Sequence, residues 1–118
     1  MKPLSGDARQ NLLHSIDFSI EFIDKTGLRD NKEVLCECLV QIVRDFYLFK
    51  NGSLLEDSIE KAMEGTDFSF APEESQTLRS IEKAMRKEKD YRETIETLDI
   101  RLLHNMLKKL KTAIKINI

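Results

Sequence analysis

Glycine and proline are scarce in this chain, which has four glycines and two prolines among its 118 residues. Gly27, Gly52 and Gly65 each follow an amphipathic stretch and are predicted to end helices, because glycine adopts the left-handed conformation at low cost. Gly6 lies in the N-terminal tail. No glycine is therefore left for a phosphate-binding loop, and the sequence has neither a Walker motif nor a dinucleotide-binding fingerprint.

Cysteine is also rare, since Cys36 and Cys38 are the only two in the sequence. Two residues apart on a helix, their side chains point about 200° apart, and no second pair is present to complete a zinc site. We interpret both as small core residues. So few cysteines favour a reducing, cytoplasmic setting.

Long apolar runs are missing as well. The longest uncharged run of the most apolar segment covers residues 38–43, far fewer than the roughly 20 residues that a membrane-spanning helix needs. The first ten residues contain no apolar run that could serve as a signal peptide. The sequence therefore predicts a soluble cytoplasmic protein with no membrane span.

The most apolar segment defines the predicted fold. Between positions 34 and 49, twelve of sixteen residues are apolar. The other four fall within an arc of about 100° on a helix, which predicts a helix over about 31–50 that is buried on every other side. Those four polar residues are Glu37, Gln41, Arg44 and Asp45. Asp30 is the expected cap of this helix, with Glu33 three residues later in capping-box position.

Amphipathic stretches on both sides of this central helix predict further helices. One begins at Asp7, one covers 53–65, and one opens at Pro72, whose missing N–H is tolerated in the first turn. The apolar pattern lapses in the charged stretch 86–93, so either the helix breaks there and Asp90 caps a last helix over about 91–115, or one long helix covers 72–115. We favour the break, because helices longer than 25 residues are uncommon in compact domains. The residues expected to face inward include Leu12, Leu13, Ile16, Phe18, Ile20, Phe22 and Ile23 in the first helix, and Leu78, Ile81 and Met85 in the fourth.

Short connections between such helices favour antiparallel neighbours. The composition, 41% hydrophobic and 34% charged, is typical of helical proteins. We therefore predict an all-α protein, an antiparallel bundle of four to five helices around the central one. A flexible tail over 1–6 would precede a single helical domain over 7–118.

The sequence offers no metal or cofactor motif. Di-iron bundle proteins need Glu-x-x-His on facing helices, but Asn11 stands three residues before His14, and Arg101 three before His104. The acids Glu56, Glu60 and Glu64 line one face of the predicted third helix. We interpret them as a solvated face, because carboxylates that act as acids or bases need a desolvated cleft. No cofactor, metal ligand or catalytic set is predicted.

Two short stretches resemble known families. Arg9, four residues and then His14 resemble the arginine-to-histidine spacing of HEPN-type ribonucleases, small helical bundles that usually act as dimers with both side chains at the dimer cleft. That resemblance implies a ribonuclease, although the family usually places the motif late in the domain. The sequence FAPEES at 70–75, followed by an amphipathic helix, resembles bacteriocin immunity proteins, which are four-helix bundles, but this chain continues with a further long helix.

A row of basic residues runs along the last helix. Its members fall within about 80° of one another, opposite the leucine-rich side. Such a stripe can follow a nucleic-acid backbone, an anionic membrane or an acidic protein. It can equally solvate the end of a helix, where the dipole favours cations, or face the acidic third helix. The basic stripe consists of Arg101, His104, Lys108, Lys111 and Lys115.

The central helix is apolar over more of its circumference than a few short neighbours can cover, which predicts an interface. The candidate partner-binding residues, which can also be ordinary core, are Phe46, Tyr47, Phe49, Phe68 and Phe70. The sequence therefore favours a non-enzymatic helical interaction protein: an adaptor, an inhibitor or an immunity-type regulator that binds a partner protein, with a homodimer as one form. Nucleic-acid binding through the basic stripe and a HEPN-like ribonuclease are the alternatives.

Overall fold

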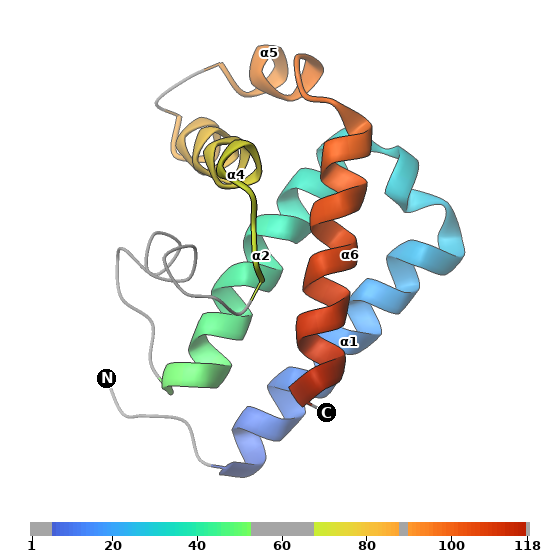
Figure 1. Cartoon of the computed structure of the whole chain (residues 1–118), viewed down its shortest axis with the longest axis vertical. Coiled ribbons are helices and arrows are strands. Elements are labelled where there is room, and N and C mark those ends of the chain that lie inside the picture. The colour runs from blue at the N-terminus through green and yellow to red at the C-terminus, as the bar shows by residue number, and fades with distance from the viewer. Residues whose placement is uncertain (1–5, 53–67, 88–89, 118) are drawn as a thin grey trace.

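A computed structural model of the chain describes residues 6–52, 68–87 and 90–117 (Figure 1). These residues are helical with irregular connections and include no strand, which confirms the all-α prediction. Residues 1–5 of the predicted tail over 1–6, and the predicted third helix over 53–65, lie outside the described residues. Gly6, the last residue of that predicted tail, is helical. The elements are α1 (Gly6–Thr26), the 3-10 turn η1 (Leu28–Asp30), α2 (Lys32–Asn51), α4 (Pro72–Met85), α5 (Tyr91–Glu96) and α6 (Ile100–Asn117).

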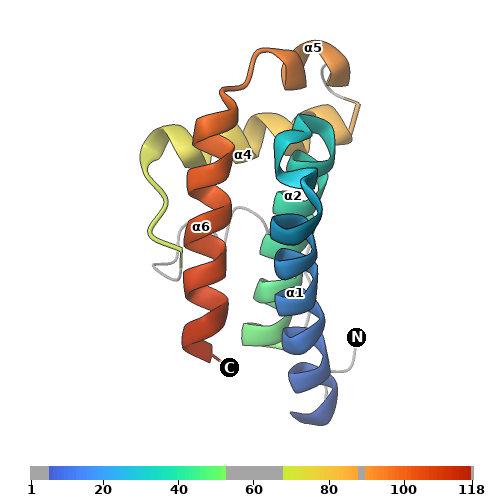
Figure 2. The same ribbon diagram turned by 90° about the vertical axis from the view of Figure 1, so that its right-hand side faces the viewer.

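Helices α1, α2 and α6 pack side by side, and each contacts the other two (Figures 1 and 2). Helix α1 is antiparallel to α2, because Arg9 near its start reaches the carbonyl of Phe49 near the end of α2. It is also antiparallel to α6, since Asp24 contacts Lys111 and Asp17 contacts Lys115. Helices α2 and α6 therefore run in the same direction, and α4 lies across them rather than alongside (Figure 2).

Helix α2 is the central helix of the bundle and contacts α1, α4, α5 and α6. Glu37, Gln41 and Arg44 are exposed and Asp45 is half-buried, which confirms the predicted polar stripe. Most of the apolar residues of α2 are buried, but Val34, Cys38, Tyr47 and Leu48 are half-buried. Its buried residues are Leu35, Cys36, Leu39, Val40, Ile42, Val43, Phe46 and Phe49.

The ends of α2 are fixed by local backbone geometry. Gly27 has φ 77°, and it is followed by the turn η1, which includes Asp30. The cap of α2 is consequently Asn31, whose side-chain oxygen accepts a hydrogen bond from Val34 N at 3.1 Å, and the prediction of Asp30 as cap is wrong. At the other end Gly52, with φ 79°, stops the helix as predicted.

The described residues after 67 contain two helix starts that the sequence predicts and one that it does not. Helix α4 begins at Pro72, and Asp90 caps α5 by accepting from Glu93 N at 2.8 Å. The prediction of one helix over 91–115 is wrong, because α5 ends at Glu96. Asp99 then accepts a hydrogen bond from Arg101 N at 2.9 Å and begins α6, a local side-chain bond that competes with a continuous helix.

Some side chains predicted to face inward are exposed instead. Ile16 and Ile20 are buried in the core, but Phe18 is 71% exposed and Phe22 is 50% exposed. Each phenylalanine stands two residues from Ile20, about 200° around the helix, so the predicted inward stripe is too wide. Met85, at 42% exposed, also faces outward at the end of α4.

Candidate functional site

Four of the five predicted partner-binding aromatics form a cluster at the C-terminal end of α2. The ring centroid of Phe46 lies 5.0 Å from that of Phe68 and 5.9 Å from that of Phe49. Phe70 stacks on Phe68 at 5.3 Å. Phe46, Phe49 and Phe68 are buried, whereas Tyr47 and Phe70 are half-buried and pack against the core. Within a single chain, therefore, only Tyr47 and Phe70 of this set reach the surface.

Arg9 closes the same end of α2. Its Nε donates to the carbonyl of Phe49 at 2.7 Å, and one terminal nitrogen donates to the carbonyl of Lys50 at 3.1 Å. Its guanidinium also lies 5.5 Å from the centroid of the Phe49 ring. The last carbonyls of a helix have no partner within the helix, so Arg9 stabilises the end of α2 by donating to two of them.

His14 does not join Arg9 in a common site. It is exposed on α1, and five residues of helix turn it about 140° away from Arg9. The structure of the single chain thus directs the arginine toward α2 and the histidine toward solvent. The HEPN-like ribonuclease stays a prediction, and within a single chain Arg9 and His14 do not form its site together.

The C-terminal half of the basic stripe lies against acidic residues of α1. Lys111 Nζ is 2.8 Å from Asp24 Oδ2, and Lys115 Nζ is 3.1 Å from Asp17 Oδ1 and 3.2 Å from Glu21 Oε1. Hydrogen bonds to Asp17 and Glu21 raise the pKa of Lys115, and the bond from Lys115 lowers the pKa of Glu21. These cations are therefore partly neutralised within the fold.

The N-terminal half of the stripe is more open. Arg101 and Lys108 are exposed. The backbone N–H of Arg101 donates a hydrogen bond to Asp99, and the side chain of Arg101 donates a second one. These bonds lower the pKa of the Asp99 carboxyl. His104 Nε2 lies 3.9 Å from Asp30 Oδ1. The positive surface available to a partner is thus shorter than the sequence predicts, and the acidic stretch 53–65 lies outside the described residues.

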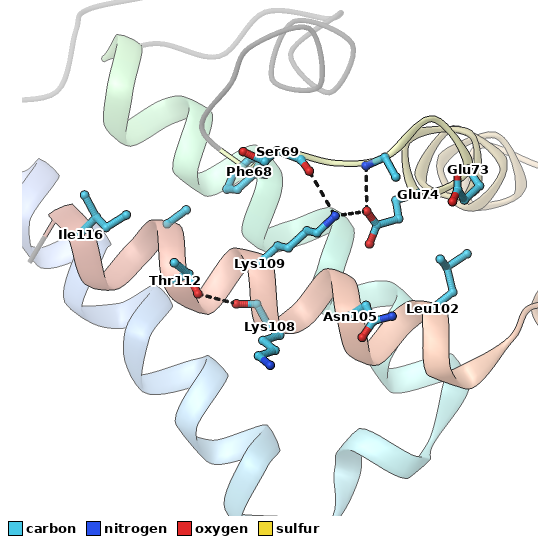
Figure 3. A pocket seen from close by; sticks show the side chains of 12 residues that line it. Phe68, Ser69, Glu73, Glu74, Leu102, Asn105, Lys108, Lys109, Thr112 and Ile116 are labelled. Carbon is cyan, nitrogen blue, oxygen red and sulfur yellow. Dashed lines mark hydrogen bonds and ion pairs between the residues drawn. The ribbon is translucent and has the colours of Figure 1, made fainter.

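A groove of about 680 Å³ runs between α6, the segment 68–71 and the start of α4 (Figure 3). Phe68, Leu102 and Ile116 contribute apolar walls. Lys109 crosses the groove and donates to the carbonyl of Ser69 at 3.1 Å and to the carboxylate of Glu74. The ion pair joins α4 to α6, and the bond to Ser69 joins the segment 68–71 to α6.

Glu74 is the buried member of that pair, at 2% exposed. Its Oε1 also accepts from the backbone N–H of Ala71 at 2.8 Å, which completes the first turn of α4. The carboxylate of Glu74 and the ammonium group of Lys109 thus both have protein partners, because each holds an element in place. We interpret the groove as a structural joint between α4 and α6.

The two cysteines are free thiols. Burial raises the pKa of Cys36 to about 12, and it also raises the pKa of the half-buried Cys38. A thiol with a raised pKa is a poor nucleophile at neutral pH. Within the described residues no group of three or more His, Cys, Asp or Glu could hold a metal ion, and none of the described helices is long and apolar enough to cross a membrane.

An aromatic pair on α1 is the surface feature that the sequence analysis missed. Phe18 and Phe22 stack with centroids 6.4 Å apart and an interplanar angle of 25°, and both are exposed. The signal that could have identified them is angular, because both point away from the isoleucine stripe formed by Ile16, Ile20 and Ile23. Two large apolar side chains on an otherwise polar face are typical of a contact surface.

Comparisons with known protein families, with curated proteins and with solved structures find no match to the chain.

Proposed function

We propose that this chain is a non-enzymatic helical interaction protein that acts by binding a partner protein, as an adaptor, an inhibitor or an immunity-type regulator does. One observation carries the proposal. Helix α1 buries Leu13, Ile16, Ile20 and Ile23 but leaves the rings of Phe18 and Phe22 exposed. Exposing two aromatic rings to water is unfavourable, and aromatic residues are frequent anchors at protein interfaces.

The positions of the other candidate residues are compatible with this proposal. Arg9, Glu74 and Lys109 all hold helices together, so their polar groups serve the fold. The thiols of Cys36 and Cys38 have raised pKa values and suit a core rather than covalent chemistry. Their reduced state fits the cytoplasmic setting that we propose for the protein.

A capture experiment with matched variants tests the proposal. The chain is immobilised as bait in a lysate of its source cells, alongside a variant carrying Phe18→Ala and Phe22→Ala. Ile116→Ala is the control, because Ile116 is an exposed apolar residue, 77% exposed, on another helix. We expect wild-type and control baits to retain the same partner protein and the double variant to lose it.

Circular dichroism must first show that all three baits are folded. The proposal is wrong if the double variant retains every protein that the wild-type bait retains. It is also wrong if no protein is retained above the level of an unrelated helical bait.

Nucleic-acid binding is the second candidate, favoured by the exposure of Arg101 and Lys108 on α6. We expect Arg101→Glu with Lys108→Glu to abolish any salt-sensitive binding to a mixed-sequence RNA or DNA, because phosphate contacts release counterions. Lys111 is unsuitable for this test, since it pairs with Asp24 and its replacement would weaken the fold. Equal affinity in the wild-type chain and the double variant would eliminate this candidate.

A further inference from the structure

We infer that the outer face of α1 binds a second copy of this chain, with the two α1 helices packed antiparallel across a two-fold axis near Phe18. The inference rests on the proposed function, because it identifies a partner for the same exposed aromatic pair. All the residues involved lie in α1, in the position that this helix has in the folded chain.

Among the described helices, α2 and α6 are the main neighbours of α1. In Figure 2, α2 lies behind α1 and α6 lies beside it, so neither covers the face of α1 turned toward the viewer. Six exposed residues fall within an arc of about 80° on this face and form one continuous strip. The outer strip consists of Asp7, Asn11, His14, Phe18, Phe22 and Lys25.

Charge is distributed along the outer strip so that it complements itself. Asp7 lies in the first turn of α1 and Lys25 in the last, with the two phenylalanines between them. A parallel pair of helices would place Asp7 beside Asp7 and Lys25 beside Lys25. An antiparallel pair brings the acidic end of each helix toward the basic end of the other, and it also opposes the two helix dipoles favourably.

The register follows from the aromatic residues. With Phe18 on the two-fold axis, Lys25 lies opposite Asn11 of the second copy, and Asp7 is four residues, about 6 Å, further along that helix. A lysine side chain spans that distance. Phe22 in the same register lies opposite His14 of the second copy, so the rings form the centre and the ion pairs form the rim.

A two-fold interface uses the same patch on both copies, which a self-complementary strip satisfies without any other partner. One helix face per copy buries less than the roughly 1,200 Å² of a standard interface. The dimer should therefore be weak, with a dissociation constant in the micromolar range or weaker. At low concentration the same face would be open to a different protein.

Analytical ultracentrifugation of the full chain over a wide concentration range tests the inference. We expect the wild-type chain to shift reversibly from monomer to dimer. Phe18→Glu should weaken the dimer at least tenfold, because the two copies would bury like charges at the axis. Ile116→Glu, which adds the same charge at an exposed apolar position of α6, should leave the dissociation constant unchanged.

Charge reversal tests the orientation of the two helices. Asp7→Lys alone and Lys25→Asp alone should each weaken the dimer several-fold, and the double variant should restore it. The existing contact of Lys25 with Glu21, at 3.7 Å, is lost in Lys25→Asp and in the double variant but kept in Asp7→Lys. The comparison of Lys25→Asp with the double variant is therefore the one that this contact does not affect. Failure of the double variant to recover affinity overturns the antiparallel arrangement.

The outcomes separate this inference from the proposed function. A wild-type chain that stays monomeric at every concentration overturns self-association. If the same monomer still retains a different protein through Phe18 and Phe22, the proposed interaction function stands. If it neither dimerises nor retains a partner, both are wrong.

Discussion

At the scale of single residues, Phe46 packs the end of α2 against the connection to α4. Its ring is 1% exposed and contacts Phe49 from the same helix and Phe68 from the connection to α4. It therefore joins two segments that are distant in sequence. Large buried rings with several neighbours leave a cavity that the surroundings cannot fill when they are truncated.

We predict that Phe46→Ala lowers the free energy of unfolding by about 3–5 kcal/mol, the usual cost of removing a buried phenylalanine ring. Tyr47→Ala, next to it and only half-buried, should cost less than about 2 kcal/mol. Urea denaturation followed by circular dichroism measures both values. Equal losses for the two variants would show that Phe46 is not in the core.

Cys36 predicts a loss of stability at alkaline pH. Burial raises the pKa of its thiol from 9.0 to about 12, so the folded state binds the proton more tightly than the unfolded state. Below pH 9 the buried thiol makes its full contribution to the free energy of unfolding. Between pH 9 and 12 this contribution is lost, because the thiol ionises in the unfolded chain but stays protonated in the folded one. Tyr91, whose pKa burial raises from 10.0 to about 12, adds to the loss above pH 10.

Urea denaturation at several pH values from 8 to 11 measures this effect. We expect the free energy of unfolding of the wild-type chain to fall above pH 9, and that of Cys36→Ala to fall less steeply. Parallel curves for the two chains would contradict the burial of this thiol.

At the scale of helices, the contact between α1 and α6 is partly electrostatic. Lys111 and Lys115 bridge to three carboxylates of α1. We predict that Lys111→Met lowers the free energy of unfolding by less than about 1 kcal/mol, because half-exposed ion pairs are weak. The difference from wild type should shrink in about 1 M NaCl, where charges are screened over a few ångströms.

Lys83→Met on the exposed face of α4 is the control for this experiment, since it removes an exposed lysine of another helix. Its effect should be small at every salt concentration. If the loss of unfolding free energy in Lys111→Met did not change with salt concentration, the loss would come from the packing of the side chain and not from its charge.

The turn between α1 and α2 depends on one backbone conformation. Gly27 has φ 77°, and a Cβ added there would meet nothing within 4 Å. We predict that Gly27→Ala costs about 1 kcal/mol through backbone strain alone. Gly6→Ala, where a Cβ would also meet nothing, should be neutral, and thermal unfolding of both variants measures the difference. A neutral Gly27→Ala would contradict the left-handed turn.

Sequence patterns predicted the helices of this fold better than their surfaces. The structure confirms the predictions that rest on local signals. These are the dense apolar stretch around Val40, the helix stops at Gly27 and Gly52, and the cap at Asp90. The start of α6 at Asp99 was missed, because the apolar rhythm continues across the break and hides it.

The candidate site was less predictable because it depends on which helices become neighbours. Periodicity places Phe46 on an apolar face but does not say that Phe68 covers it. The pairing of Lys115 with Asp17 joins residues from opposite ends of the chain, and no local pattern encodes it. The outward orientation of Phe18, by contrast, was available from its angle to Ile20 and was overlooked.

At the scale of the whole molecule, α2 and α6 run in the same direction, with α1 antiparallel to both and α4 lying across them (Figures 1 and 2). The chain between α2 and α6 must therefore return to the end where α2 began. This topology leaves α1 at the edge of the bundle, since it is covered by two helices only in part. The open side of α1 is the surface on which we place the interaction function.

The most direct test of this account is fluorine NMR of the chain with all six phenylalanines replaced by fluorophenylalanine and assigned by single substitutions, recorded from micromolar to millimolar concentration. The account predicts that the resonances of Phe18 and Phe22 shift as the concentration rises, while those of Phe46, Phe49 and Phe68 stay fixed. Concentration-independent resonances for Phe18 and Phe22, or a shift confined to the Phe46 cluster, would contradict the dimer formed through α1.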